Sequence, residues 1–249
     1  MNIEIPLNPI IVTGATSGIG EATTNALLKE GCNIAIVGRS LNKLHDKFSN
    51  VPIGSNFYEC DISSKENICN LIKSIVNDMG PIGGLVHCAG VCIQETVRFL
   101  KDKTLFDTFN INLFSLFNFL FFIRKKENHC KNTKIITFSS IFSNHGQISL
   151  SAYAASKGAL ESSVKTLSYE LRKDSILINT LRLGMLNTPM LEKSFAMMPK
   201  EEKDYQTKRH ILGIGNVDDI IPSIMFLLSN QSNWITGSTF CIDGGYNAI

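Results

Sequence analysis

The sequence predicts a single-domain α/β protein with a doubly wound, parallel, seven-stranded sheet that has helices on both faces. Short apolar runs alternate with longer amphipathic stretches almost from end to end of the 249 residues. Hydrophobic residues make up 44% of the chain, which is enough for a large core. No Pro/Gly/Ser linker, low-complexity segment or fixed-period repeat divides the chain, so residues 1–249 are expected to form one domain.

Seven apolar runs have the length and composition of buried strands. They are Ile10–Thr13, Asn33–Val37, Asn56–Glu59, Gly84–Cys88, Lys134–Ser139, Leu177–Leu183 and Thr239–Ile242. Because consecutive runs are separated by helix-length segments, parallel pairing through crossover connections is expected.

Six amphipathic stretches are the predicted helices, most with turn residues at one or both ends. They are Gly18–Glu30, Leu41–Phe48, Lys65–Met79, Lys103–Arg124, Ala152–Arg172 and Asp218–Leu228. Gly31 is placed to end the first of them in a left-handed conformation. Right-handed crossovers would distribute these helices over both faces of the sheet.

One stretch, residues 188–215, breaks the alternation and is rich in Met, Phe, Lys and Glu. Loops of this length inside compact domains usually have a function. We therefore expect a lid over a substrate; a surface insertion without a substrate role is the alternative.

Charge and composition narrow the classes of partner. The net charge of +2 comes from interspersed Lys and Arg, so neither nucleic acid nor a membrane surface is an expected partner. The seven cysteines form no CxxC pair or zinc spacing, which predicts a reduced compartment and no metal.

Residues 1–6 lack the pattern of a secretory signal, and the most apolar run, Leu113–Ile123, is too short to cross a bilayer. We expect a cytoplasmic protein.

A glycine-rich turn follows the first predicted strand and opens the first helix. Its proposed ligand-binding residues are Gly14, Thr16, Ser17, Gly18, Ile19 and Gly20. The backbone N–H groups at a helix start, and its positive dipole end, suit a dinucleotide pyrophosphate in a Rossmann-like fold. A helix-capping turn without a ligand is the alternative.

The residues after the second and third strands bear on which nucleotide binds. No Asp or Glu lies between Gly31 and His45, whereas Arg39 and the adjacent Ser40 suit a ribose 2′-phosphate. NADP is therefore the expected cofactor; alternatively, Arg39 is a solvated residue at a helix start. Asp61 and Ile62 are placed to bracket the adenine, or else to cap the next helix.

Four polar residues are predicted to meet at the carboxyl edge of the sheet, where doubly wound folds bind ligands. Tyr153 and Lys157 stand four positions apart on one helix face, Ser140 ends the fifth strand, and Asn112 lies on the preceding helix. Each residue singly has an ordinary structural interpretation. Their combination indicates a catalytic site.

The chain resembles the short-chain dehydrogenase/reductase family, particularly its 3-oxoacyl-[acyl-carrier-protein] reductase-like members, over nearly its whole length. The shared motifs are Thr-Gly-x-x-x-Gly-Ile-Gly at 13–20, Asp61-Ile62, Cys88-Ala89-Gly90, Asn112, Ser140, Tyr153, Lys157 and Asp243-Gly244-Gly245. The resemblance implies hydride transfer between nicotinamide and a carbonyl or secondary alcohol while Tyr153 exchanges the proton on oxygen. Lys157 would lower the tyrosine pKa and hold the nicotinamide ribose, Ser140 would bind the substrate oxygen, and Asn112 would hold a water.

The same resemblance implies that Gly184, Leu186 and Thr188 contact the nicotinamide end of the cofactor, and that Cys88, Ala89 and Gly90 lie along it. Two departures stand out. His87-Cys88 replaces the usual Asn-Asn, so altered local hydrogen bonding is expected. Leu183 replaces the usual proline before Gly184, which loosens that turn.

Phenylalanines occupy more than one face of the predicted helix 103–124, and the resemblance implies that this helix pairs with a second subunit, giving a homotetramer or homodimer. Burial within one monomer is the alternative. The expected partner is a small carbonyl or alcohol substrate, with 3-oxoacyl thioester reduction as one candidate. Reduction of a sugar-derived or other small ketone, and a non-enzymatic NADP-binding regulator on the same fold, stay open.

Overall fold

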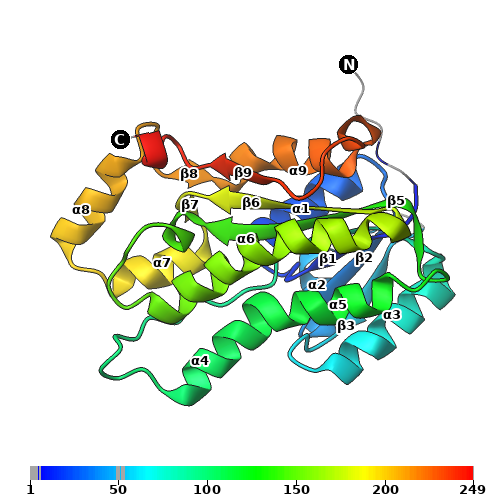
Figure 1. Cartoon of the computed structure of the whole chain (residues 1–249), viewed down its shortest axis with the longest axis horizontal. Helices are drawn as coiled ribbons and strands as arrows, with labels where there is room; N and C mark the ends of the chain where they lie inside the picture. Colours follow the sequence, from blue (N-terminus) through cyan, green and yellow to red (C-terminus); the bar gives the residue numbers. More distant parts are fainter. Residues whose placement is uncertain (1–4, 6, 49–50, 52–53, 249) are drawn as a thin grey trace.

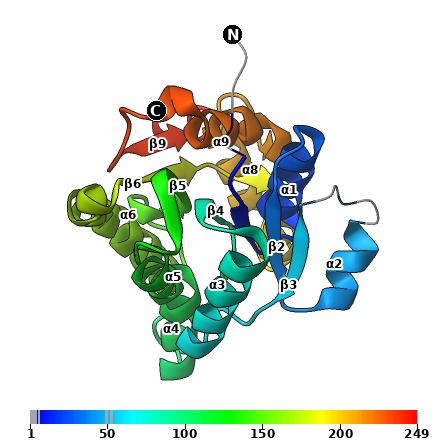
Figure 2. The same cartoon turned by 90° about the vertical axis from the view of Figure 1, so that its right-hand side faces the viewer.

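A single seven-stranded parallel sheet, in the order β3-β2-β1-β4-β5-β6-β9, forms the centre of the molecule (Figures 1 and 2). The computed structural model describes residues 5, 7–48, 51 and 54–248. The strands are β1 Ile10–Thr13, β2 Ile34–Gly38, β3 Asn56–Glu59, β4 Ile82–His87, β5 His129–Ser140, β6 Ile176–Leu183 and β9 Thr239–Ile242. The expected absence of a secretory signal concerns residues 1–6, which, apart from Ile5, lie outside the described residues.

Helices cover both faces of this sheet, as predicted (Figure 2). They are α1 Gly18–Lys29, α2 Leu41–Lys47, α3 Lys65–Met79, α4 Asp102–Phe109, α5 Ser115–Ile123, α6 Ser151–Leu171, α7 Pro189–Ala196, α8 Lys200–Arg209 and α9 Ile221–Leu228. The predicted last helix is shorter, because residues 217–220 form a 3₁₀ turn before α9. Gly31 has the expected left-handed conformation, with a φ of 72°.

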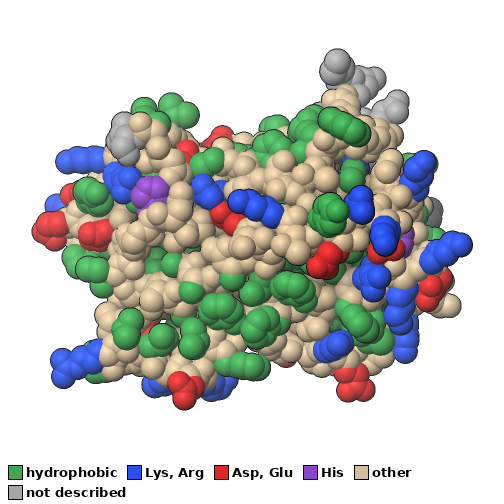
Figure 3. Space-filling view, in the orientation of Figure 1, with side chains coloured by type: hydrophobic (Ala, Val, Ile, Leu, Met, Phe, Trp, Pro, Cys, Tyr) green, Lys and Arg blue, Asp and Glu red, His purple; other side chains and the backbone are tan. Residues whose placement is uncertain are grey.

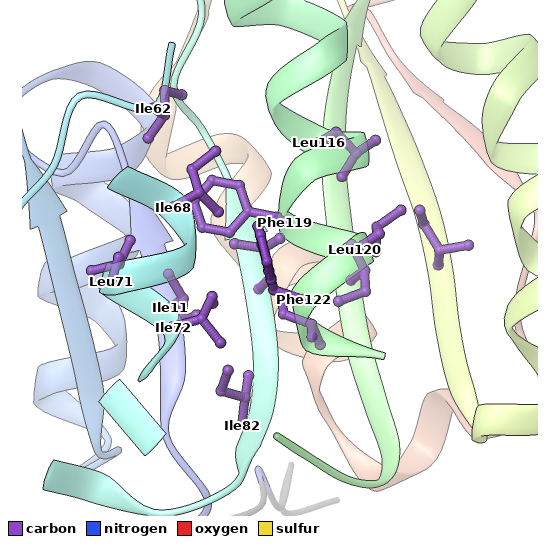
Figure 4. Close-up of a cluster of buried hydrophobic side chains, with 14 of the residues drawn as sticks. Ile11, Ile62, Ile68, Leu71, Ile72, Ile82, Leu116, Phe119, Leu120 and Phe122 are labelled. Atoms are coloured by element: carbon purple, nitrogen blue, oxygen red, sulfur yellow. The ribbon is translucent and has the colours of Figure 1, made fainter. Parts of the chain in front are cut away.

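Each face of the sheet has its own hydrophobic core. One core joins β1 and β4 to α3, α5 and α6, and Figure 4 shows Ile68 and Ile72 of α3, Phe119 of α5 and Ile11 of β1 converging there. The other core packs α1, α2 and α9 on the opposite face. All residues of β1 and β2 are buried. Strands buried on both faces need nearly continuous apolar runs, which is why these segments were recognisable in the sequence.

The predicted unbroken helix at residues 103–124 was wrong in one respect: a π-helical turn, Asn110–Phe114, separates α4 from α5. Such turns interrupt the regular hydrogen-bond ladder and often occur at functional sites. The continuous helical stretch Asp102–Ile123 is also long and apolar enough to cross a membrane by length and composition, contrary to the shorter apolar run considered above. Half of it is buried and it packs on α3 and α6, so it is a core helix of the fold.

Residues 188–215 are not an irregular loop. They contain α7 and α8, and their two ends meet where β7 Leu186–Asn187 pairs in parallel with β8 Gly215–Asn216. The short β7–β8 ladder therefore holds the two ends of residues 188–215 together beside the carboxyl end of β6.

Candidate active site

The glycine turn between β1 and α1 is shaped by close backbone contacts. A Cβ atom at Gly14 would lie 3.0 Å from the backbone of Ala89, and one at Gly20 would lie 2.3 Å from the Gly14 carbonyl oxygen. Gly14 and Gly18 also have positive φ values of 66° and 55°. Side chains at these positions would push the turn away from the β4 end or strain its backbone.

This turn forms one wall of an elongated pocket. Twelve of the predicted cofactor residues line it: Gly14, Thr16, Ser17, Gly18, Ile19, Arg39, Asp61, Ile62, Cys88, Ala89, Gly90 and Thr188. A glycine cradle at a helix start, extending to a guanidinium at the β2 end, fits a dinucleotide. Gly20 packs behind the turn and Ser40 is the N-cap residue before α2; these two predicted residues are not among those lining the pocket.

Asp61 lies in this pocket beside Arg39. Its carboxylate Oδ1 accepts the Ser63 backbone N–H at 3.0 Å. Hydrogen bonds from Ser63, aided by the charge of Arg39, hold the pKa of Asp61 below its usual value. The cap of α3 is Ser64, which accepts the Asn67 N–H, so the alternative role of Asp61 as helix cap was wrong.

A second, mainly apolar pocket adjoins the first and shares six lining residues with it, including Ile19, Gly90 and Thr188. Ser140, Tyr153 and Lys157 all line this second pocket, together with the predicted Gly184 and Leu186. Their elements explain the convergence: β5 ends at Ser140, and α6 begins at Ser151, so the first turns of α6 stand beside the strand end. The spatial grouping expected from the spacing is therefore present.

Burial sets the electrostatics of the tyrosine–lysine pair. The Lys157 Nζ lies 5.7 Å from the centre of the Tyr153 ring and donates to the Phe138 carbonyl at 2.7 Å. Burial lowers the pKa of Lys157 to about 8. Burial also raises the pKa of Tyr153, and the hydrogen bond with Ser140 partly offsets that rise. The protein environment alone thus keeps the phenol protonated.

Asn112 lies in the π-helical turn, outside the residues that line either pocket. Its Oδ1 accepts the Val91 N–H at 2.8 Å, and its Nδ2 donates to the Val91 carbonyl and to the Ser156 hydroxyl at 2.9 and 3.0 Å. The asparagine therefore ties the pocket wall at Val91 to α6. A Cβ at Gly90 would come within 3.3 Å of its Oδ1, so that wall requires a small residue.

The first departure from the family pattern is a buried hydrogen-bond relay. The His87 ring is 4% exposed; its Nδ1 lies 3.1 Å from the Thr13 hydroxyl and its Nε2 lies 2.9 Å from the Ser115 hydroxyl. Burial, and to a lesser extent the charge of Lys157, lowers the pKa of His87 to about 3. His87 therefore stays neutral, and its two hydrogen bonds join β4 to β1 and to α5. The local hydrogen bonding thus differs from the family pattern, as expected.

Some pocket residues were not recognised from the sequence. Cys92 and Val91 line the wall beside Tyr153, and burial raises the pKa of Cys92 to about 11. Their signal was available, since they follow Gly90 directly. Phe142, Met185, Met190 and Met198 also line the pocket. Among the described residues, no cluster of His, Cys, Asp or Glu suited to a metal ion is present.

The fold and the paired pockets define a dinucleotide-dependent oxidoreductase. A family model described as enoyl-(acyl carrier protein) reductase matches residues 14–247. The chain belongs to the short-chain dehydrogenase/reductase family, whose members use NAD(P), and it is an oxidoreductase of that type.

Three relatives illustrate the range of activities around this chain. It is 29% identical to the 3-oxoacyl-[acyl-carrier-protein] reductase of Thermotoga maritima, with 94% of this chain and 96% of that protein covered. It is 29% identical to the NADP-dependent (R)-specific alcohol dehydrogenase of Lentilactobacillus kefiri, with 96% of each chain covered. The structure of 4-hydroxyisoleucine dehydrogenase complexed with NADH superposes with a TM-score of 0.86 at 27% identity, covering 97% and 99% of the two chains.

Proposed function

We propose that the protein is an NADP-dependent reductase of an apolar carbonyl compound, with Tyr153 as the proton donor. The observation that carries this proposal is the placement of Ser140, Tyr153 and Lys157 around one pocket that opens into the glycine-turn pocket. When bound, the nicotinamide supplies the hydride. The Ser140 hydroxyl binds the carbonyl oxygen and Tyr153 donates a proton to it, giving the alcohol.

Lys157 performs two tasks in this scheme. Its ammonium, 5.7 Å from the Tyr153 ring centre, favours the phenolate left after proton donation and opposes the effect of burial on that group. Its Nζ is also placed to hold the ribose hydroxyls next to the nicotinamide. Asn112 supports both tasks, because its hydrogen bonds fix Val91 in the pocket wall and Ser156, the residue before the lysine in α6.

Arg39 supports the choice of NADP. It lines the nucleotide pocket at the end of β2, where a guanidinium can bind a phosphate through several donors. The relatives do not share one cofactor: one is an NADP-dependent alcohol dehydrogenase, and another was solved in complex with NADH.

The apolar lining of the catalytic pocket supports the substrate class. Apart from the catalytic trio, the side chains nearest the substrate space include Phe142, Leu150, Met185 and Met190. Such walls suit an acyl chain, as in a 3-oxoacyl thioester, better than a polyhydroxylated sugar ketone, whose hydroxyls need hydrogen-bond partners. Residues 188–215 would act as the lid, because Thr188, Met190, Leu191 and Met198 already line the pocket.

The assembly and location proposed from the sequence are a homotetramer or homodimer in the cytoplasm. Exposed phenylalanines on α4 and α5 support the assembly, and the seven free cysteines support a reducing compartment.

Replacing the proposed proton donor tests the mechanism. Tyr153→Phe keeps the ring but removes the hydroxyl, so turnover should fall at least about a thousandfold if proton transfer depends on it. NADPH binding, measured by fluorescence titration, should change little. The assay is NADPH oxidation over 3-oxoacyl thioesters, cyclic ketones and ketosugars. A Tyr153→Phe enzyme with substantial activity would disprove the mechanism.

Replacing Arg39 tests the cofactor. The wild-type protein should bind NADPH more tightly than NADH, and Arg39→Ala should narrow that difference by roughly tenfold or more, since a charge-assisted contact to phosphate is lost. NADH affinity serves as the internal control and should stay nearly constant. Equal affinity of the wild type for both nucleotides would contradict the NADP assignment.

A further inference from the structure

A buried histidine joins the proposed lid to the turn beneath the catalytic pocket. His210 follows the last residue of α8 and is 3% exposed. Its Nε2 accepts the Met185 backbone N–H at 3.0 Å, and its Nδ1 lies 2.8 Å from the Gln206 carbonyl. A carbonyl can only accept, so Nδ1 carries the proton and Nε2 is the acceptor. The contacts therefore require the neutral ring in one tautomer.

The ring is held tightly against the turn after β6. A Cβ at Gly184 would lie 3.0 Å from the His210 Nε2, so glycine permits the approach. On its other side the ring packs against Tyr246, with ring centres 4.8 Å apart. The Tyr246 hydroxyl donates to the Gln206 side chain at 2.9 Å, and the Arg209 guanidinium lies 4.1 Å from the Tyr246 ring centre. The histidine cannot move without disturbing α8 and the C-terminal segment together.

Both backbone polar groups of Met185 form hydrogen bonds with residues of the segment 188–215. Its N–H binds His210, while its carbonyl accepts the Gly215 N–H at 3.1 Å next to the β7–β8 ladder. Gly184, Met185 and Leu186 all line the catalytic pocket. The chain has Leu183 where the family pattern has a proline, so the backbone of this turn lacks a fixed φ just before it. The two hydrogen bonds supply the restraint instead.

We propose that His210 is a positioning residue, whose neutral ring fixes the Gly184–Met185 turn against the bound nicotinamide and couples that turn to α8. The inference rests on the proposed function for the identity of the bound group. It adds a residue outside both pocket linings to the machinery of the site.

The surroundings of the ring leave backbone groups as its hydrogen-bond partners. The charged or titratable groups around the ring are Arg209 on its own segment, Glu202 through Gln206, Asp243 beside Gly184, and His145 across Tyr246. In the structure, none of these carboxylates is bonded to the imidazole nitrogens, which are occupied by backbone groups.

Two substitutions test the acceptor role of the His210 Nε2 separately from the donor role of its Nδ1. In His210→Asn the side-chain amide can still donate to the Gln206 carbonyl but is too short to reach the Met185 N–H. In His210→Gln the side-chain oxygen reaches about as far as Nε2 and accepts at every pH. His129→Asn, at the start of β5, is the matched control because its Nδ1 contacts only the adjacent Cys130 carbonyl.

The measurements are NADPH affinity by fluorescence, kcat and KM at pH 7.5, and the thermal midpoint of each protein. His210→Asn should weaken NADPH binding and raise the substrate KM by about fivefold to tenfold, with a smaller change in kcat, as the loss of one hydrogen bond predicts. His210→Gln should stay within about twofold of the wild-type NADPH affinity and KM, because it keeps the acceptor for the Met185 N–H. His129→Asn should retain the wild-type affinity and KM.

The outcomes distinguish the two proposals. If His210→Asn binds NADPH as wild type does, or if His210→Gln loses as much NADPH affinity as His210→Asn, His210 is not a positioning residue. A lowered thermal midpoint in both variants, with unchanged binding, would show a purely structural role and would also overturn the inference. Failure of the wild-type protein to bind NADPH would instead contradict the proposed function itself.

Discussion

At the scale of single residues, burial rather than sequence neighbourhood sets the chemistry. Lys134, on β5 and far from Tyr153 in the fold, is 2% exposed, and its Nζ donates to Ser232 and Asn233 at 3.2 and 2.7 Å. Burial lowers the pKa of Lys134 to about 8, as it does for Lys157. The sequence singles out Lys157 by its spacing from Tyr153, but no feature of the sequence predicts the lowered pKa of either lysine, because desolvation depends on what the fold packs around them.

This shared shift predicts how stability depends on pH. The folded pKa values lie below the ordinary lysine value of 10.5, so above about pH 8 the unfolded chain binds more protons than the folded protein. The contribution of these lysines to the free energy of unfolding should therefore rise with pH between about 8 and 9. The buried cysteines oppose this rise over the same window, because unfolded thiols lose protons around their ordinary pKa of 9.0 whereas the folded protein raises the pKa values.

Lys134→Met checks the assignment, because it keeps the apolar stem without the titrating group. We expect it to remove roughly half of the rise, measured by urea unfolding at pH 7.5, 8 and 9, since two similar groups contribute. Lys73→Met, at an exposed position of α3, is the control and should leave the slope unchanged. An unaltered slope in Lys134→Met would contradict the prediction.

At the scale of elements, α6 is attached to the sheet by a buried ion pair. Glu161 lies one turn beyond Lys157, and its Oε1 accepts from Arg182 Nε at 2.9 Å and from the Ser143 hydroxyl at 2.7 Å. A second contact joins its Oε2 to the Arg182 Nη2. The pair links α6 with β6 and with the turn after Ser140, so it supports the elements that hold the catalytic residues.

Removing one partner of this ion pair should destabilise the protein more than removing both partners. Glu161→Leu leaves the partly buried Arg182 guanidinium without its carboxylate, which should lower the free energy of unfolding by about 2 kcal/mol. Glu161→Leu combined with Arg182→Leu should recover a substantial part of that loss, because no unpaired charge remains. Urea unfolding of both single variants and the double variant measures the coupling; strictly additive effects would contradict this account.

The elements themselves were largely predictable. Six of the seven main strands were predicted within two residues of their ends, whereas β5 begins five residues before its predicted start. The central strands were recognisable because strands buried on both faces are nearly continuous apolar runs. The π-helical turn at Asn110–Phe114 was not predicted, since its apolar pattern fits an ordinary helix; within it Asn112 contacts Val91 across the chain. The β7–β8 ladder was also missed, because each strand has two residues.

At the scale of the whole molecule, the surface over α4 and α5 carries exposed aromatic side chains (Figure 3). Phe106, Phe114, Phe117 and Phe121 are 61%, 41%, 41% and 50% exposed. Hydrophobic side chains gathered on one surface are typical of protein–protein contacts. Pairing of subunits through this helix stays a prediction; Phe119 and Phe122 from the same helix are buried in the monomer's own core.

Charged substitutions on this surface test the assembly. Phe117→Glu with Phe121→Glu should shift the protein toward a monomer in light scattering after size-exclusion chromatography, since two carboxylates would be desolvated in the interface. Leu7→Glu, at another exposed apolar position, should leave the mass unchanged. A monomeric wild-type protein, or a double variant of undiminished mass, would contradict the proposal.

The sequence by itself determined the fold class, because local periodicity survives without knowledge of distant contacts, and the motifs that resemble a known family indicated the family and the proposed site residues Ser140, Tyr153 and Lys157. Only the tertiary structure decided that His87 binds both Thr13 and Ser115, that Cys92 faces the tyrosine, and that His210 holds Met185. The physical reason is distance along the chain: these contacts join residues brought together by packing, and neither hydrogen bonds across elements nor burial leave a periodic pattern in the sequence.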